Sequence, residues 1–305
     1  MRATYLAAQA PPPHARSAQT VGDPGRRAVD RSIGSLLQDA LELSDQQIAR
    51  VSEYQHRNGV RFGEAAVALK LATGDDVMRS LARQFHYPYG AAQREVDPEL
   101  ILACQPFSKE SEVFRELRSQ LLMGVLSCER PRRALAVVSP DRRDGKTFVS
   151  ANIAVALSQL GGRTLLVDAD MRTPRQHEVF RIDDRRFGLS SILSDRCEHN
   201  IVQSISELPG LSVLTAGPVP PNPLELVHRP SFLLLLDELI DKFDHVIVDT
   251  PANVHGADAR VIAAQCGAAL VIGRKGRTRM KAMDPLLCSL RNGPSLLAGV
   301  VFNDY

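Results

Sequence analysis

The chain has 305 residues and 44% of them are apolar, which is enough for one large or two ordinary domains with a hydrophobic core. Its formal net charge is only +2, so neither nucleic acid nor another strongly charged partner is implied. The five cysteines are scattered and none forms a C-x-x-C pair, which argues against a disulfide framework or a zinc site and fits a reducing cytoplasm.

Residues 1–30 are expected to be a disordered leader, because they hold a Pro-Pro-Pro run and no apolar periodicity. No apolar stretch follows Arg2 or the Arg26-Arg27 pair, so neither a secretory signal nor a twin-arginine signal is expected. The longest apolar runs, residues 232–236 and 268–272, are far below the roughly 18–20 residues that span a bilayer. We therefore expect a cytoplasmic protein without a membrane span of its own.

Residues 31–92 contain an internal repeat. The stretch Ile33-Gly34-Ser35-Leu36-Leu37 returns 29 residues later as Phe62-Gly63-Glu64-Ala65-Ala66. In each copy a short apolar turn follows the glycine, and a capping residue, Ser44 or Thr73, then begins an amphipathic helix. Two such units predict a small α-helical repeat domain.

This repeat resembles the N-terminal domain of type II secretion and pilus ATPases, whose pattern is Arg-Leu-Gly … Gly … Leu … Gln. Some members of that family bind cyclic di-GMP. Here only the second copy keeps the arginine, as Arg61, and Ser32 stands in the first. The later family glycine is replaced by Leu41 and Lys70. A protein-docking module is therefore the preferred interpretation, with cyclic di-GMP binding as the alternative.

Residues 93–130 are interpreted as a linker, marked by Pro98 and Pro106, that leads into a helix over residues 111–126. Glu112, Arg115 and Arg118 are spaced three residues apart, so they share one face of this helix. We call these three residues the Glu-Arg-Arg motif.

From residue 131 to residue 305, short apolar runs alternate with helical stretches. The predicted strands are residues 134–138, 164–167, 211–214, 245–248, 268–272 and 297–302. The predicted helices are residues 147–160, 223–242, 257–265 and 280–291. Continuous apolar strands that alternate with helices predict an α/β fold, a doubly wound and mostly parallel sheet covered on both faces.

The first of these strands runs into the loop Ser-Pro-Asp-Arg-Arg-Asp-Gly-Lys-Thr, residues 139–147, with a helix behind it. Backbone N–H groups and the helix dipole at such a turn face an anion, which makes this a P-loop. Lys146 is predicted to contact the β/γ-phosphates of ATP, and the Thr147 hydroxyl to ligate Mg²⁺. The general pattern has glycine where Pro140 stands. The predicted ATP-binding residues are Arg143, Asp144, Gly145, Lys146, Thr147 and Phe148.

Two further strands end in aspartate. Residues 165–172 read Leu-Leu-Val-Asp-Ala-Asp-Met-Arg, and residues 246–251 read Val-Ile-Val-Asp-Thr-Pro. The carboxyl ends of parallel strands meet at one edge of a sheet, where phosphates bind. Asp168, Asp170 and Asp249 can there hold Mg²⁺ or accept a hydroxyl proton. The three motifs together predict a site for ATP and Mg²⁺.

This set of motifs resembles the bacterial tyrosine kinases of capsule and exopolysaccharide export, and the chain-length-determinant kinases called EpsG in particular. The family has a Walker A motif, the Asp-x-Asp-x-Arg motif found here at residues 165–172, and the Walker B motif found at residues 246–251. The resemblance covers residues 95–305 and includes Gly-Pro-Val-Pro-Pro-Asn-Pro-Leu-Glu-Leu at residues 217–226. It also includes the Glu-Arg-Arg motif, which in the family docks one subunit against the active site of the next.

The resemblance implies roles for single residues. Lys146 would be catalytic and Asp168 would be the base toward a tyrosine hydroxyl. Asp170 and Asp249 would join Thr147 at the metal, although the division of roles between Asp168 and Asp170 stays open. Arg172 and Arg175 would add positive charge near the phosphates.

The same resemblance implies a setting. It implies homo-oligomers formed through the Glu-Arg-Arg motif, and a membrane polysaccharide co-polymerase as partner that holds the kinase at the inner membrane. The family's C-terminal tyrosine cluster is absent, and Tyr305 is the one late tyrosine and the candidate phosphosite.

The loop departs from the family, which usually has glycine at the position of Asp141 or Arg143. A residue with a side chain in a left-handed backbone costs about 1–2 kcal/mol, and the charged residues of the loop could pair with one another. Three functions follow: an ATP-dependent tyrosine autokinase, a degenerate ATP-binding scaffold without catalysis, or a MinD/ParA-like positioning ATPase. The last requires a signature lysine where Asp141 stands, so the kinase is the leading interpretation.

Overall fold

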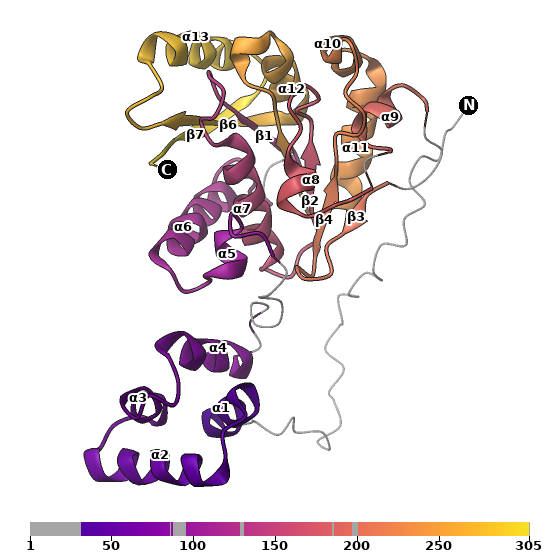
Figure 1. Ribbon diagram of the computed structural model, residues 1–305. Helices are drawn as coiled ribbons and strands as arrows, with labels where there is room; N and C mark the ends of the chain where they lie inside the picture. Colours follow the sequence, from indigo (N-terminus) through magenta and orange to yellow (C-terminus); the bar gives the residue numbers. More distant parts are fainter. Residues whose placement is uncertain are drawn as a thin grey trace. The chain divides into compact units, whose positions relative to one another are not determined.

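The computed structural model describes residues 32–85, 87, 96–128, 131–184, 186–196 and 201–304 (Figure 1). The predicted leader and Tyr305 lie outside these residues. The chain divides into two compact units with the boundary between residues 93 and 94, and each unit is described by itself. No helix among the described residues is both long and apolar enough to cross a membrane.

The small unit consists of four helices, two from each copy of the repeat, in which α1 packs on α4 and α2 packs on α3. This confirms that the repeat is helical. Its helices are α1 (Ile33–Leu41), α2 (Asp45–Asn58), α3 (Phe62–Ala68) and α4 (Gly74–Gln84). The predicted caps are present, because Ser44 Oγ accepts from Gln47 N and Thr73 Oγ1 accepts from Asp76 N. The prediction of a short apolar turn after each repeat glycine was wrong, because both of these stretches form helices, α1 and α3.

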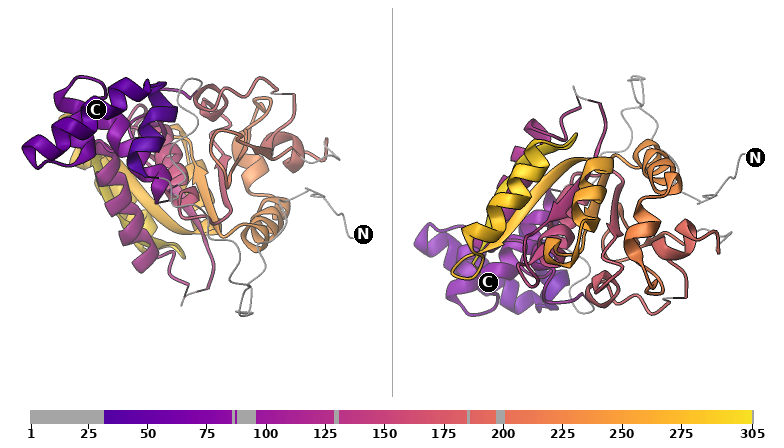
Figure 2. Two further views of the ribbon diagram at one scale, coloured as in Figure 1. Left: turned by 90° about the horizontal axis from the view of Figure 1, so that it is seen from below. Right: turned by 90° about the horizontal axis from the view of Figure 1, so that it is seen from above.

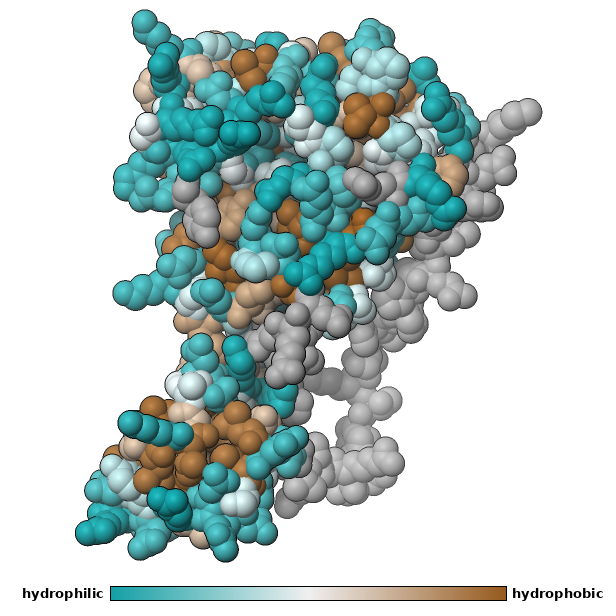
Figure 3. Space-filling model, viewed as in Figure 1, coloured by the Kyte–Doolittle hydropathy of each residue, from teal (hydrophilic) through white to brown (hydrophobic). Residues whose placement is uncertain are grey.

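The repeat glycine of the second copy, Gly63, has a packing role between α3 and α4. A Cβ atom on Gly63 would lie 2.5 Å from Val77 Cγ1, so α3 and α4 approach closely there. Figure 3 shows apolar surface gathered on one side of the small unit. Its exposed large apolar side chains are Val67, Met78, Phe85 and Tyr87. This surface suits a docking module, which stays a prediction.

The large unit is built on a seven-stranded sheet in the order β3-β4-β2-β5-β1-β6-β7. The strands are β1 (Ala134–Val138), β2 (Thr164–Asp168), β3 (Gln203–Ser204), β4 (Leu211–Leu214), β5 (His245–Asp249), β6 (Gly267–Arg274) and β7 (Leu296–Asn303). All neighbouring pairs are parallel except β3 with β4. The predicted doubly wound sheet is confirmed, with the two-residue β3 as an addition.

Helices cover both faces of the sheet (Figures 1 and 2). Alternate strand residues point to opposite faces, so Leu135 and Val137 join one apolar core while Ala134 and Ala136 join the other. On the first face lie α5 (Ile101–Cys104), α6 (Lys109–Met123), α7 (Lys146–Ser158) and α8 (Gln176–Val179). On the second lie α9 (Leu189–Leu193), α10 (Pro223–Val227), α11 (Pro230–Lys242), α12 (Asp258–Cys266) and α13 (Met280–Arg291).

Two helices differ from their predicted extents. Residues 223–242 form two helices rather than one, because Pro230 lacks an N–H and begins α11 while Arg229 before it is extended. The helix predicted over residues 111–126 is α6, capped by Ser108 Oγ. Phe114 and Leu121 of α6 pack into the same core as α7, so this helix is part of the large unit.

Candidate nucleotide-binding site

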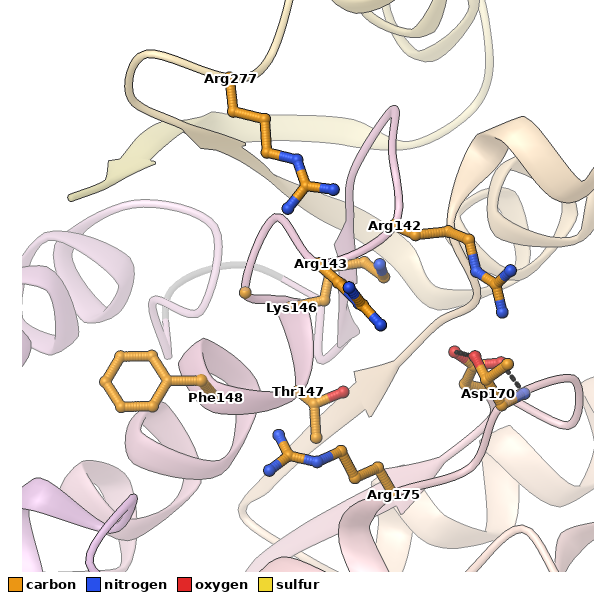
Figure 4. Close-up of a pocket in the computed structure, with 10 residues that line it drawn as sticks. Arg142, Arg143, Lys146, Thr147, Phe148, Asp170, Arg175 and Arg277 are labelled. Carbon is orange, nitrogen blue, oxygen red and sulfur yellow. Dashed lines mark hydrogen bonds between the residues drawn. The ribbon is translucent and has the colours of Figure 1, made fainter. Parts of the chain in front are cut away.

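The three predicted motifs meet at the carboxyl edge of the sheet. Strand β5 lies between β2 and β1, and its Asp249 is in register with Asp168 on one side and Val137 on the other. The P-loop after β1 therefore faces the acid ends of β2 and β5. A pocket of about 620 Å³ opens there (Figure 4). Its walls are Arg142, Arg143, Gly145, Lys146, Thr147, Phe148, Asp170, Thr173, Arg175 and Arg277.

Lys146 begins α7 and is almost fully buried, with 7% of its surface exposed. Its Nζ donates to Ser139 Oγ at 3.0 Å. Burial lowers the pKa of Lys146, and the carboxylates of Asp249 and Asp170 oppose this effect. The ammonium group is poorly solvated at the first turn of a helix, so an anion bound there would stabilise it.

Asp249 at the end of β5 has one satisfied and one orphaned oxygen. Its Oδ2 accepts from Gln176 Nε2 at 2.8 Å, whereas the buried Oδ1 has no hydrogen-bond partner among the described residues. Burial raises the pKa of Asp249 to about 6, although the charge of Lys146 opposes this shift. A buried carboxylate oxygen without a partner is where a cation or its water ligand fits.

Asp170 lies on the pocket wall, so it can reach a metal beside Asp249. Its own Oδ1 accepts from the backbone N–H groups of Arg172 and Thr173, which fixes the orientation of the carboxylate. No cluster of three or more histidine, cysteine or acidic side chains in the described ranges is arranged to hold a metal alone. Mg²⁺ typically binds through one or two carboxylates together with substrate phosphates, and these residues fit that mode.

Asp168 has a different environment from Asp170. Its carboxylate is fully buried and accepts three backbone N–H groups, those of Asp170, Arg175 and Gln176, at 3.0–3.1 Å. Burial and the nearby charge of Asp249 raise the pKa of Asp168 well above its ordinary value. Asp168 is not a wall of the pocket. Its role as the base stays a prediction, and it would need the start of α8 to release these hydrogen bonds.

Gln176 connects all three motifs, although no sequence motif indicates this residue. Its Nε2 lies 2.8 Å from Asp249 Oδ2, 2.9 Å from Ser150 Oγ and 3.2 Å from the Thr147 carbonyl oxygen. Its backbone N–H donates to Asp168. One fully buried amide thus holds the P-loop helix, the Asp-x-Asp loop and Asp249 in fixed relation.

Comparison with known proteins decides the family. The model of the CobQ/CobB/MinD/ParA nucleotide binding domain matches residues 135–305. The tyrosine-protein kinase YwqD of Bacillus subtilis (strain 168) is 30% identical over 204 residues, which cover 67% of this chain and 85% of YwqD. The chain belongs to the bacterial tyrosine-kinase family.

Further relatives agree with this assignment. The kinase domain of the Escherichia coli tyrosine kinase ETK matches with a TM-score of 0.63 and 31% identity, covering 67% of this chain and 79% of that domain. The tyrosine-protein kinase ptk of Acinetobacter johnsonii is 33% identical over 193 residues. That match covers 63% of this chain but 26% of ptk, so the chain spans about a quarter of this relative's length.

The loop of this family member has the unusual backbone expected from its sequence. Arg143 is left-handed, with φ 62°, as is Gly145, with φ 101°. Asp144 was predicted to bind ATP, but its side chain is fully buried and turned away from the pocket. Its Oδ2 accepts from Asp141 N and its Oδ1 accepts from Thr278 Oγ1. Asp144 therefore holds the loop in place through these two hydrogen bonds. A carboxylate at the phosphates would repel them, so this inward position suits an anion-binding loop.

The two arginines after the Asp-x-Asp motif diverge. Arg175 lies on the pocket wall as predicted, and its guanidinium group pairs with Glu99. Arg172 instead pairs with the buried Asp258, with a shortest N–O distance of 3.1 Å. The prediction that Arg172 adds charge near the phosphates was wrong, because Asp258 on α12 neutralises it. Arg277 on the loop after β6 supplies a pocket cation that no motif had indicated.

Glu112, Arg115 and Arg118, the Glu-Arg-Arg motif, lie on α6, and the two arginines make contacts within their own chain. Arg115 pairs with Glu112 and donates to the Pro106 carbonyl, while Arg118 Nη1 donates to the Ala156 carbonyl oxygen at 2.9 Å. The Glu112 side chain is 69% exposed. Both arginines thus help hold α6 against the loop before it and against α7, and docking to a second subunit stays a prediction.

Proposed function

We propose that this chain is an ATP-dependent protein-tyrosine kinase. The observation that carries the proposal is the buried Lys146 at the start of α7, which shares the wall of a pocket of about 620 Å³ with Thr147 and Asp170. Membership of the tyrosine-kinase family supports phosphoryl transfer as the reaction. The Asp141 residue at the signature-lysine position argues against a MinD/ParA-like positioning ATPase.

The proposed roles follow from the environments of the side chains. Lys146 and the first turn of α7 would bind the β/γ-phosphates, and Thr147, Asp170 and Asp249 would hold Mg²⁺. The bound Mg²⁺ would neutralise charge on the phosphate oxygens. In the transfer, the bond from the terminal phosphorus to the ADP oxygen breaks and a bond to the tyrosine oxygen forms. The phenolic proton passes to a carboxylate, either Asp168 or Asp170.

The proposed setting is a polysaccharide export machine. A kinase of this family would act with a membrane co-polymerase, in the cytoplasm at the inner membrane, and as a homo-oligomer. The helical repeat of the small unit would be a docking point for such a partner. Tyr305 is the proposed acceptor in autophosphorylation.

A second candidate is a scaffold that binds ATP without transferring phosphate. The buried and fully hydrogen-bonded Asp168, together with the left-handed Arg143, favours it. The two functions separate in one experiment, because a scaffold binds Mg-ATP but leaves tyrosine unphosphorylated.

The test replaces Lys146 by methionine in the full chain and measures Mg-ATP binding and tyrosine phosphorylation. The matched control is Lys281→Met, which removes a lysine from the exposed side of α13. We expect binding to fall at least tenfold in Lys146→Met alone, since one charge-assisted contact contributes about 1.5–3 kcal/mol. Equal affinity in Lys146→Met and wild type would refute the site. Binding without any phosphotyrosine, with a co-polymerase tail present, would favour the scaffold.

A further inference from the structure

The wall of the pocket carries more positive charge than the predicted motifs supply. Besides Lys146, the guanidinium groups of Arg142, Arg143 and Arg277 line it, and Asp170 is its one acidic wall residue in the described part of the chain. Figure 4 shows these three guanidinium groups directed into the pocket, with Arg142 on the side of Asp170. We call Arg142, Arg143 and Arg277 the arginine rim.

The rim arginines are distinguished from others by the absence of protein partners. Across the described ranges, none of their guanidinium groups makes an ion pair or a side-chain hydrogen bond. Arg172 and Arg175, by contrast, pair with Asp258 and Glu99. The charge of the rim is therefore uncompensated by the protein and available to an anion.

The rim is held together by a hydrogen-bonded bridge between its two loops. Thr278 Oγ1 donates to Asp144 Oδ1 at 2.8 Å, and the Arg274 backbone N–H donates to Thr278 Oγ1 at 2.7 Å. Asn303 Nδ2 donates to the Asp144 carbonyl oxygen at 3.3 Å. The bond between Thr278 and Asp144 ties the loop after β6, which carries Arg277, to the P-loop, which carries the other two arginines, and Asn303 joins the end of β7 to the same P-loop. Arg277 is thus positioned beside the phosphate loop although it lies far along the sequence.

Lys146 and the rim arginines lie at different depths in the pocket, so we expect them to contact different oxygens of a bound nucleotide. Lys146 is buried at the floor, where α7 begins, whereas the rim arginines are exposed at the mouth. Asp170 marks the side of the pocket where the metal and the transferred phosphate would bind, and Arg142 lies toward Asp170 (Figure 4). Arginine forms charge-assisted, often bidentate hydrogen bonds with phosphate oxygens.

We propose that the arginine rim is a side-chain clamp for the terminal phosphate, through which this P-loop distinguishes nucleoside triphosphate from diphosphate. The inference rests on the proposed nucleotide-binding function. It assigns a phosphate-binding role to Arg143, which stands at the usual glycine position, and to its neighbour Arg142. Arg277 joins them from a second loop.

The experiment titrates the full chain with a non-hydrolysable ATP analogue and with ADP, both with Mg²⁺, at low and high salt. The variants are Arg142→Ala, Arg277→Ala and the conservative Arg277→Lys. The control is Arg291→Ala, which removes the same charge from an exposed position outside the pocket. We expect each alanine variant on the rim to lose about tenfold or more in affinity for the ATP analogue, much less for ADP, and to show a weaker salt dependence. Arg277→Lys should recover part of the loss, and Arg291→Ala should bind as wild type.

Two results would overturn the clamp. One is wild-type affinity of both alanine variants for the ATP analogue, and the other is an equal loss for the analogue and for ADP. Lys146→Met in the same series separates this failure from that of the proposed function. If Lys146→Met weakens binding while the rim variants do not, only the clamp is wrong. If the wild type binds neither nucleotide, the proposed function itself fails.

Discussion

Replacing Asp249 by asparagine should stabilise the nucleotide-free protein while abolishing Mg-ATP binding. Burial moves the pKa of Asp249 from its ordinary 3.8 to about 6. Each pKa unit corresponds to about 1.4 kcal/mol, so keeping this carboxylate ionised costs the fold about 3 kcal/mol at neutral pH. Asparagine has nearly the same shape, carries no charge and can still accept a hydrogen bond from Gln176. The loss of a counter-charge for Lys146 subtracts from the gain.

The pH dependence gives the prediction its sign. The folded state holds the Asp249 proton more tightly than the unfolded state, so the wild-type fold loses stability between about pH 4 and pH 6 as this group ionises. Asp249→Asn lacks that loss. The variant's advantage should therefore grow from pH 5 to pH 7 and then level off. At neutral pH we expect up to about 3 kcal/mol, with about 2–4 °C in Tm for each kcal/mol in a unit of this size.

Thermal unfolding of both proteins between pH 5 and pH 8, without nucleotide, measures this difference. Asp241→Asn is the control, because it removes an acidic charge from an exposed position on α11. With Mg-ATP added, the order should reverse, since only the wild type gains the free energy of ligand binding. A variant that is less stable than wild type at every pH would refute the reasoning from the buried charge.

Three further predictions concern single features of the site. Gln176→Leu should destabilise the large unit by about 1.5–3 kcal/mol, because it leaves the buried Asp249 carboxylate without this hydrogen-bond donor. Denaturant unfolding measures this loss, with Gln120→Leu on the exposed surface of α6 as the control. Arg143→Gly should leave stability unchanged or raise it by up to about 1 kcal/mol by relieving the left-handed backbone, yet should weaken binding of the ATP analogue; a gain in affinity would contradict the rim. Triple alanine substitution of the Glu-Arg-Arg motif should shift an oligomer toward monomer in light scattering, and an unchanged mass would count against docking through this helix.

The sequence was sufficient for the parts of the site that each depend on a local motif. A strand followed by Gly-Lys-Thr located Lys146 at a helix start, and two apolar runs ending in aspartate located Asp168 and Asp249. Their meeting follows from parallel strands, whose carboxyl ends share one edge, and the register of Asp168 with Asp249 confirms it.

What the sequence could not predict depends on which loops and helices meet in three dimensions. Arg277 reaches the pocket because Thr278 binds Asp144, a contact between the loops that follow the neighbouring strands β1 and β6. Asp144 itself points inward for the same reason. Gln176 acquires its role only once Asp249 lies opposite it. The helices α1 and α3 were missed because each is a short apolar segment of seven to nine residues, whose periodicity is too brief to separate from a turn.

The contacts of α5 and α6 set the smallest fragment that can serve in experiments on the nucleotide-binding site. A fragment cut at residue 131, just before the sheet begins, would lose two hydrogen bonds to α7. One is from Asn152 Nδ2 to the main-chain oxygen of Glu99 at 2.8 Å, and the other is from the Arg118 guanidinium group to the carbonyl oxygen of Ala156. It would also uncover the apolar side of α7 on which Leu102 and Phe114 pack. Since α7 carries Lys146 and Thr147 at its first turn, a fragment that starts at residue 131 would report a damaged scaffold rather than the true affinity of the site for nucleotide.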